Sequence, residues 1–207
     1  MEIVTVCAGY SSANSYLLID EETNQAALVD PGGEANELIF AIQANAVKVC
    51  AILLTHGHFD HILALDEIKK YTGAPVYIHR LDNACLTNPE FSLMTLAGRN
   101  DTFASADVLL EDGDTISVGT STVEVIYTPG HTVGSVCFKT DAGIISGDTL
   151  FYESIGRTDF PGGDFATIDA SIRCLYAIEG DEKIYPGHGE PTTLSHERKY
   201  NPFVRQR

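Results

Sequence analysis

The chain has 207 residues, 44% of them hydrophobic, and carries 29 acidic against 13 basic side chains for a formal net charge of −16. This length is enough for one sizeable hydrophobic core, and we expect a single domain over residues 1–207. The negative charge opposes contact with nucleic-acid phosphates and with anionic membrane surfaces. No basic and apolar leader opens the chain, and no stretch approaches the ~18 apolar residues that span a bilayer. We therefore expect no nucleic-acid partner and no membrane association.

The cysteines are scattered and odd in number. They stand at Cys7, Cys50, Cys85, Cys137 and Cys174. No two of them share the CxxC spacing, so the sequence predicts neither a disulfide framework nor a thiolate zinc site. Reduced thiols are typical of a cytoplasmic protein, and we expect that location.

The first half of the chain predicts a β-meander and then alternating helices and strands. The expected elements are strands at 4–7, 15–19 and 26–29, a helix at 34–46, a strand at 47–54, a helix at 61–71, a strand at 74–78 and a helix at 81–88. Turn-forming residues at 9–14 and 20–24 separate the first three strands. The run 47–54 is apolar throughout, which indicates a strand buried on both faces. The weakly patterned stretch that continues to Phe103 is expected to wall a substrate pocket.

The second half repeats the alternation of strands and helices. The expected elements are strands at 108–110, 123–127, 135–138 and 143–145, a helix at 165–178 and a strand at 183–185. Two sets of strands with flanking helices, in a chain of this size, predict an α+β protein. We expect a four-layer αββα sandwich rather than a doubly wound parallel sheet.

A dense group of potential metal ligands follows the buried strand at 47–54. It consists of His56, His58, Asp60 and His61. Histidine and aspartate are poor choices for the end of a buried strand unless they have a partner. Imidazole nitrogen and carboxylate oxygen suit zinc, iron or manganese, and no cysteine nearby offers a soft thiolate. One histidine here would be interpreted as a solvated loop residue, but four ligand-type residues at this spacing indicate a metal or catalytic site.

Three later loops each follow a predicted strand and carry one ligand-type residue beside a glycine. These residues are His131, Asp148 and His188. Taken singly, a capping Asp148 or a solvated His188 would be unremarkable. Their recurrence after strands favours a shared site, because strand ends present such residues together.

The order of these residues resembles the motifs of the metallo-β-lactamase superfamily, which are HxHxDH, a lone His, a lone Asp and a final His. The resemblance extends from Asp30 to the end of the chain and implies the αββα metallo-β-lactamase fold. It implies one metal ion on His56, His58 and His131, a second on Asp60, His61 and His188, and Asp148 bridging them with a hydroxide. Asp60 and Asp148 are then the expected catalytic residues. The expected cofactors are two divalent ions, with zinc favoured and iron or manganese also suited.

The residues also indicate a branch of that superfamily. Asp148 stands where many true β-lactamases carry Cys, and His58 stands where flavodiiron oxygen reductases carry Glu. The stretches SIGRTDF at 154–160, EPTT at 190–193 and NPF at 201–203 resemble the short bacterial hydrolases of the glyoxalase II-like, or hydroxyacylglutathione hydrolase-like, type. Glyoxalase II proper has a C-terminal helical domain that grips glutathione. We expect no such domain here, so thioesterase chemistry is better supported than glutathione as the carrier.

The expected function is therefore a metal-dependent hydrolase that cleaves a small thioester of the hydroxyacylglutathione type with a metal-bridging hydroxide. A bound metal lowers the pKa of water from 15.7 to about 7. A thiolate leaving group, whose conjugate thiol has a pKa of about 8.5, needs little help from a general acid. The expected partner is a small-molecule acyl thioester.

Residues outside the motifs are further candidates. Asp30 is expected either to orient a ligand imidazole from behind or to cap a turn. Arg157 is expected either to steer an anionic substrate or to pair with Asp159. His79 and His196 are expected to be ordinary surface or core histidines.

Two other functions are alternatives. Persulfide dioxygenases share the GRTDF stretch and hold one iron on residues that match His56, His131 and Asp148, so the number of bound metals separates them from the hydrolase. A non-catalytic binding module on the same fold would show at least one eroded ligand. No ligand position is eroded in this sequence.

Overall fold

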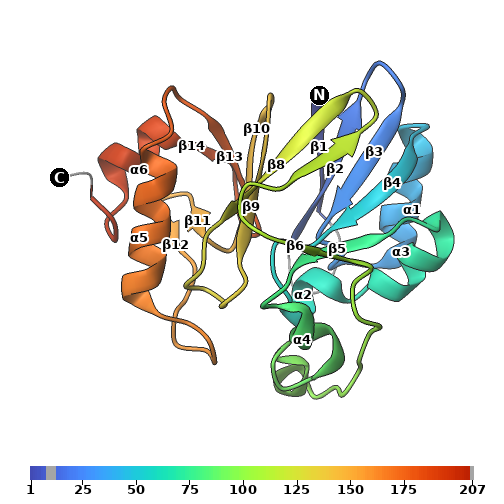
Figure 1. Ribbon diagram of the computed structural model, residues 1–207, viewed down its shortest axis with the longest axis horizontal. Coiled ribbons are helices and arrows are strands. Elements are labelled where there is room, and N and C mark those ends of the chain that lie inside the picture. Colours follow the sequence, from blue (N-terminus) through green and yellow to red (C-terminus); the bar gives the residue numbers. More distant parts are fainter. Residues whose placement is uncertain (8–12, 206–207) are drawn as a thin grey trace.

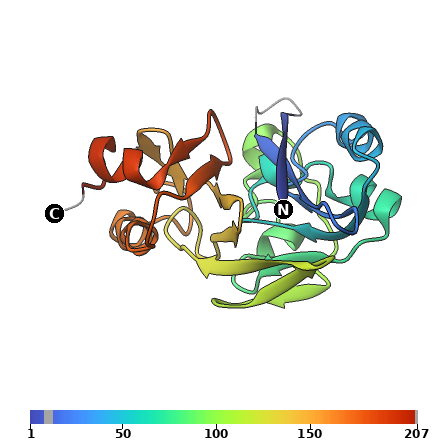
Figure 2. The same ribbon diagram turned by 90° about the horizontal axis from the view of Figure 1, so that it is seen from above.

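The protein is built of four layers, and its computed structural model describes residues 1–7 and 13–205. Two mixed sheets face each other, and helices cover the outer face of each sheet (Figure 1). Seen from above in Figure 2, α5 (Phe165–Tyr176) and α6 (Leu194–Tyr200) lie on one side of the paired sheets, and α1 (Ala35–Ala44) lies on the other. The αββα arrangement and the α+β class predicted from the sequence are confirmed.

The first sheet has six strands in the order β1-β2-β3-β4-β5-β6. These strands span Glu2–Cys7, Asn14–Asp20, Gln25–Val29, Lys48–Leu53, Val76–His79 and Val108–Leu110. The first three strands are antiparallel and form the predicted meander. Residues 9–12 of the turn-forming stretch predicted at 9–14 lie outside the described residues. From β3 to β6 all neighbours are parallel, so the loops that follow β3, β4 and β5 meet at one edge.

The second sheet has the order β14-β13-β10-β9-β8-β7. In chain order its strands, β7, β8, β9, β10, β13 and β14, span Thr115–Val118, Ser121–Tyr127, Val136–Thr140, Gly143–Gly147, Lys183–Pro186 and Thr192–Thr193. Strands β10 and β13 are parallel, and β8 runs in the same direction because it is separated from β10 by the antiparallel β9. The loops after β8, β10 and β13 therefore leave the sheet at the same edge.

Three apolar clusters separate the four layers. Leu53 and Phe138 belong to the cluster between the two sheets. Ile52 faces the other way and packs in a second cluster with Leu38 of α1 and with residues of α3 (Leu65–Thr72). Ile172 of α5 belongs to the third cluster, outside the second sheet. Strand β4 thus contributes side chains to two clusters, as predicted from its continuous apolar run.

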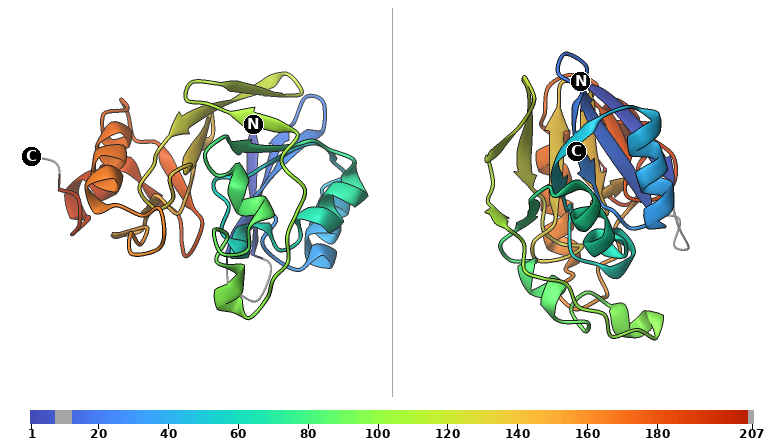
Figure 3. Two further views of the ribbon diagram at one scale, coloured as in Figure 1. Left: turned by 60° about the horizontal axis from the view of Figure 1, so that its bottom comes forward. Right: turned by 90° about the vertical axis from the view of Figure 1, so that its right-hand side faces the viewer.

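Small elements surround the edge where the loops meet. α4 (Asn83–Thr87) and the 3-10 helix η1 (Met94–Ala97), drawn in green, lie together at one end of the molecule in both views of Figure 3. A two-stranded ribbon of β11 (Leu150–Phe151) and β12 (Ser154–Ile155) follows β10.

The helices in the described ranges are all too short or too polar to traverse a bilayer. The thiols of Cys50, Cys85, Cys137 and Cys174 are free.

The single helix predicted at 61–71 is wrong. The chain instead forms α2 (Phe59–Ile62) and α3, with a turn between them. The backbone N–H of Ala64 donates to the carbonyl oxygen of Pro31 at 2.9 Å, and this contact with the loop after β3 interrupts the helix. The elements β7, β11, β12, β14 and α6 were not predicted. Three of these strands have only two residues, and α6 buries only Leu194 and Glu197, so these four elements show no clear apolar period. β7 does alternate between exposed and buried residues, but over only four positions.

Asp20 joins the two sheets at the end of β2 that lies away from Asn14. Its carboxylate accepts hydrogen bonds from the Thr23 hydroxyl at 2.5 Å, the Thr120 backbone N–H at 3.0 Å and the Ser121 hydroxyl at 2.8 Å. These bonds, that of Thr23 first and that of the Thr120 backbone second, hold the pKa of Asp20 well below its usual value. Asp20 is therefore a carboxylate that the folded chain stabilises in its charged form.

Because the pKa of Asp20 is depressed in the folded protein, its contribution to stability is present above the ordinary Asp pKa of about 4 and is lost as the pH falls towards the folded value. Asp20→Asn is expected to lower Tm at neutral pH and to flatten the decline of Tm between about pH 5 and pH 3. Thermal unfolding across this range measures the effect, with the exposed Asp66→Asn as control. Parallel Tm curves for Asp20→Asn and the parent protein would contradict the prediction.

Candidate metal centre

All seven predicted ligand residues follow the carboxyl ends of strands, five of them on loops and Asp60 and His61 in the short helix α2, and these segments meet at one end of the two facing sheets. His56, His58, Asp60 and His61 follow β4, His131 follows β8, Asp148 follows β10, and His188 follows β13. The backbone N–H of Val136 donates to the Thr55 carbonyl at 2.9 Å and ties the second sheet to the loop after β4. The parallel strands of each sheet thus bring distant parts of the chain into one cluster.

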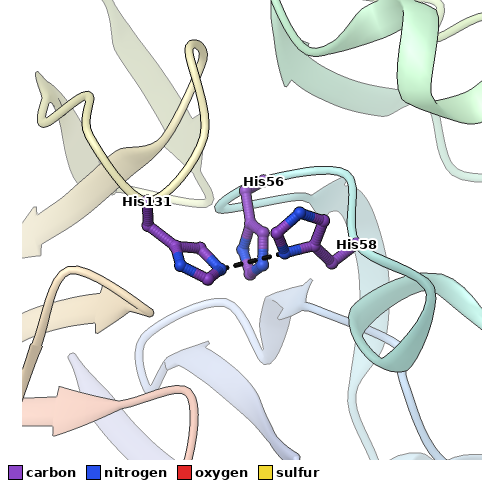
Figure 4. Close-up of side chains that lie close together, drawn as sticks. All are labelled: His56, His58 and His131. Carbon is purple, nitrogen blue, oxygen red and sulfur yellow. Dashed lines mark hydrogen bonds between the residues drawn. The ribbon is translucent and has the colours of Figure 1, made fainter. Parts of the chain in front are cut away.

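The donor atoms of the seven residues form two groups of three, and within each group all ligand atoms lie within 4.8 Å of one another. The first group is His56, His58 and His131, and the second is Asp60, His61 and His188. A further group, Asp30, His56 and His61, shares one histidine with each of these, but its Asp30 carboxylate contacts Nδ1 of His61 and not Nε2. Figure 4 shows the three imidazoles of the first group converging, with Nδ1 of His58 2.9 Å from Nε2 of His131. In the second group, Nε2 of His188 lies 3.3 Å from Oδ2 of Asp60.

Asp148 lies between the two groups. Its Oδ2 is 3.5 Å from Nε2 of His131 and 3.6 Å from Nε2 of His188, and its Oδ1 is 3.4 Å from Nε2 of His61. One carboxylate therefore faces ligand atoms of both groups. This is the position that a ligand shared by two ions would occupy.

Several buried atoms in this cluster have no hydrogen-bond partner within residues 1–7 and 13–205. They include Nε2 of His56, Nε2 of His61 and Oδ1 of Asp148. A buried polar atom without a partner costs about 1 to 3 kcal/mol, and converging lone pairs of nitrogen and carboxylate oxygen are satisfied by a divalent cation. The residues present therefore fit zinc, iron or manganese.

Hydrogen bonds at Nδ1 set the ring orientation of His56, His61 and His131. Nδ1 of His61 donates to Oδ2 of Asp30 at 2.9 Å, and Nδ1 of His131 donates to the Arg157 carbonyl at 2.8 Å. The Thr55 hydroxyl donates to Oδ2 of Asp30 at 2.6 Å, so its oxygen accepts from Nδ1 of His56 at 3.1 Å. Each ring thus turns Nε2 towards the cluster, which is the usual arrangement behind a metal-binding histidine.

Of the two roles expected for Asp30, the structure shows contact with a ligand imidazole. Its carboxylate accepts from the Thr55 backbone N–H as well as from the Thr55 hydroxyl and His61, and the residue is buried. Asp30 does not cap α1, which begins after Glu34. The contribution of Thr55 was not predicted, although a hydroxyl directly before the ligand-rich stretch was a visible signal.

The surroundings of His56 and His58 keep both imidazoles uncharged. Burial, followed by repulsion from neighbouring imidazoles, lowers the pKa of His56 well below its usual value and that of His58 to about 3. Burial also lowers the pKa of His61, but the charges of Asp148 and Asp30 outweigh it and raise that pKa well above its usual value. A cation at Nε2 of His61 would take the place of this proton.

The carboxylate of Asp148 is held in its charged form. Burial raises the pKa of Asp148, but the opposing effects of His61, His131 and His188 are larger and keep the pKa well below its usual value. A carboxylate that stays charged provides negative charge of the kind that a pair of cations requires.

A cavity of about 530 Å³ opens onto the cluster. Its floor carries His58, Asp60, His131, Asp148 and His188, whereas its walls are mostly apolar and consist of Phe59, Leu93, Leu96, Ala97, Phe151, Ser154, Ile155, Arg157 and Phe160. The weakly patterned stretch before Phe103 supplies three of these wall residues, in agreement with the prediction. Further wall residues come from the β11–β12 ribbon, which had not been predicted, and from the loop after it, where Arg157 had been named as a substrate candidate.

Arg157 pairs with Asp159, one of the two roles expected for it. Its Nε and Nη2 each lie 2.7 Å from a carboxylate oxygen of Asp159, and its guanidinium carbon lies 3.7 Å from the centre of the Phe160 ring.

The two remaining histidines lie outside the cluster. His79 stacks on Tyr127, and His196 contacts Glu153 and stacks on Tyr152. Neither histidine belongs to a donor group among the described residues.

Comparison with known proteins agrees with this architecture. The family model of the metallo-beta-lactamase superfamily matches residues 8–188, a range that contains all seven donor residues. The hydroxyacylglutathione hydrolase GloC of Haemophilus influenzae is 35% identical over 209 residues, covering 99% of this chain and 97% of that protein. The B3 metallo-beta-lactamase BLEG-1 has a TM-score of 0.93 and 37% identity, covering 99% of this chain and 100% of its own. TTHA1623 in a di-iron-bound form has a TM-score of 0.87 and 33% identity, with the same coverage.

Two complete donor groups predict about two metal equivalents per chain after reconstitution and dialysis. His131→Ala removes a donor from the first group and His188→Ala removes one from the second, so each variant is expected to retain about one equivalent. Elemental analysis of the purified proteins measures these ratios. His196→Ala, outside both groups, is the control and should retain both ions. Two retained equivalents in both His131→Ala and His188→Ala would contradict the assignment.

Proposed function

The chain belongs to the metallo-beta-lactamase superfamily, and from this premise we propose that it is a dinuclear-metal hydrolase that cleaves a small acyl thioester of the hydroxyacylglutathione type. The observation that carries the proposal is the pair of complete donor groups on either side of Asp148. A relative of nearly the same length is named a hydroxyacylglutathione hydrolase. A solved neighbour of the same length carries two iron ions.

In this proposal each donor group would hold one divalent cation, and Asp148, which faces ligand atoms of both groups, would serve both ions. Zinc is favoured by the mixed imidazole and carboxylate ligands, and iron or manganese would also be accepted. When bound, such ions lower the pKa of a coordinated water from 15.7 to about 7 and so provide hydroxide at neutral pH.

Asp60 and Asp148 are the proposed catalytic residues. Both line the cavity, with side-chain exposures of 18% and 11%, whereas His56 and His61 lie behind it. Their carboxylate oxygens are placed to accept hydrogen bonds from an attacking water and so to orient it. The Arg157 carbonyl and Asp30 keep protons on Nδ1 of His131 and His61, which leaves Nε2 of each ring facing the site.

The composition of the cavity wall favours a thioester over an amide. Apart from the proposed ligands, the only titratable wall residue in the described part of the chain is Arg157. A guanidinium does not give up a proton at neutral pH, so the wall offers no general acid to a leaving group. An amine must be protonated as it leaves, whereas a thiolate departs as the anion, because the conjugate thiol has a pKa of about 8.5.

A mononuclear-iron persulfide dioxygenase is the second candidate. His56, His131 and Asp148 lie in the same cluster, with 3.5 Å between Nε2 of His131 and Oδ2 of Asp148. In that enzyme the group formed by Asp60, His61 and His188 would hold no metal. The completeness of this second group favours the hydrolase.

The metal-loaded protein is expected to release free thiol from small acyl thioesters, including S-lactoylglutathione. Asp148→Ala is expected to lower kcat/KM by more than about 100-fold. Loss of a residue that only hydrogen-bonds to a metal ligand already lowers metal affinity or activity by about 10- to 100-fold. A thioester panel with a thiol-reactive dye measures the rates. The panel should include coenzyme A esters and a chromogenic β-lactam.

The exposed Asp66→Ala is the matched control and should leave turnover unchanged. Thermal unfolding of Asp148→Ala separates lost chemistry from lost folding. Full activity of Asp148→Ala, or hydrolysis of the β-lactam with no thioester turnover, would refute the proposal. One iron per chain together with oxygen consumption on glutathione persulfide would establish the dioxygenase instead.

A further inference from the structure

Asp82 is a buried carboxylate that belongs to none of the ligand motifs. It follows β5, at the edge where the ligand loops meet, and is fully buried. It occupies the N-cap position of α4, but its side chain makes no capping hydrogen bond to that helix. The carboxylate is therefore directed to partners outside its own element.

Those partners are the two loops that carry the first donor group. Oδ2 of Asp82 accepts from the backbone N–H of Gly57 at 3.1 Å and from the Thr132 hydroxyl at 2.7 Å. Oδ1 accepts from the backbone N–H of Gly134 at 2.7 Å. Gly57 lies between His56 and His58, and Thr132 directly follows His131. One side chain thus connects the loop after β4 to the loop after β8.

The backbone around this carboxylate is built for close approach. A Cβ added to Gly57 would lie 2.3 Å from Cβ of Cys85, and one added to Gly134 would lie 2.5 Å from Oδ1 of Asp82. Any larger residue at either position would push its loop away from Asp82. The two glycines and Asp82 therefore form one packed unit beneath the histidines.

We propose that Asp82 is a positioning residue, which holds the His56–His58 loop and the His131 loop at the separation that a divalent cation needs. The inference rests on the proposed metal centre. Two imidazole nitrogens on one tetrahedral zinc ion lie about 3.3 Å apart, given zinc–nitrogen bonds of about 2.0 to 2.1 Å. Nδ1 of His58 and Nε2 of His131 are already 2.9 Å apart. Metal sites tolerate errors of only about 0.5 Å, so a small shift of either loop weakens binding.

The donors around Asp82 make asparagine a disruptive replacement. Both carboxylate oxygens accept from backbone N–H groups, and an amide has only one accepting oxygen. If the amide oxygen of the Asp82→Asn variant faces Gly57, its NH₂ group opposes the N–H of Gly134, and the reverse holds after a flip. Asp82→Asn therefore releases one of the two loops whichever way the amide points.

The test compares Asp82→Asn with Asp20→Asn, since Asp20 is also a buried Asp that accepts several hydrogen bonds but lies at the far end of β2. Zn²⁺ affinity is measured by competition with a chromophoric chelator, and the Co²⁺ absorption spectrum reports the coordination geometry. Asp82→Asn is expected to weaken one zinc equivalent by about 10- to 100-fold and to change the cobalt spectrum. Asp20→Asn is expected to lower Tm and leave both measurements unchanged.

If Asp82→Asn does not fold, Thr132→Val and Thr132→Ser decide the question, because only valine removes the hydroxyl that donates to Asp82. Thr132→Val is expected to weaken the same zinc equivalent and Thr132→Ser to restore it. Wild-type zinc affinity in Asp82→Asn or Thr132→Val, alongside two ions in the parent protein, would overturn the positioning role. A parent protein that binds no zinc would instead overturn the proposed metal centre.

Discussion

The convergence of buried imidazoles and charged carboxylates at one end of the two sheets is the constraint on which the site depends. His56 and His58 are buried among other histidines, so their pKa values are lowered, whereas Asp148 and Asp30 raise the pKa of His61. The ligand atoms of the two donor groups lie close together, with Asp148 between the groups. A divalent cation satisfies all of these atoms at once, whereas hydrogen bonds within the described part of the protein leave several of them unpaired.

Two buried carboxylates outside the donor groups' own contacts hold this cluster in place, and each has a different role. Asp30 orients imidazole rings, because it accepts a hydrogen bond from Nδ1 of His61 and, through the Thr55 hydroxyl, fixes the ring of His56. Asp82 positions the backbone, because it accepts hydrogen bonds from the N–H groups of Gly57 and Gly134. Orientation of the imidazoles and spacing of their loops are separate requirements for tight metal binding. The fold meets each of them with its own aspartate.

The convergence of the seven proposed ligand residues was predictable because each follows a strand, and the ends of parallel strands meet at one edge. Asp82 follows the predicted strand at 74–78 in the same way, but a lone Asp with no ligand motif around it gives no sign that its partners are backbone N–H groups from two distant loops. The layers of the fold were predictable from the alternation of apolar runs. The break between α2 and α3 was not, because it depends on a contact between Ala64 and Pro31 that no local pattern encodes.

The wall of the cavity shows the same limit of sequence patterns. The β11–β12 ribbon has two residues in each strand, too few for an alternating pattern, yet it supplies Phe151 and Ile155 to the cavity. The bidentate pairing of Arg157 with Asp159 needs only two side chains close in sequence, and it was one of two roles that the sequence allowed. Local electrostatics is therefore easier to predict than the course of a short ribbon.

Anomalous X-ray diffraction from crystals of the zinc-loaded protein, collected above and below the zinc edge, tests the metal centre most directly. We expect two anomalous peaks in each chain, one within about 2.3 Å of donor atoms in the group His56, His58 and His131, the other equally near Asp60, His61 and His188. We also expect Asp148 to contact both peaks. A single peak, or peaks elsewhere on the chain with these side chains turned apart, would contradict the metal centre described above.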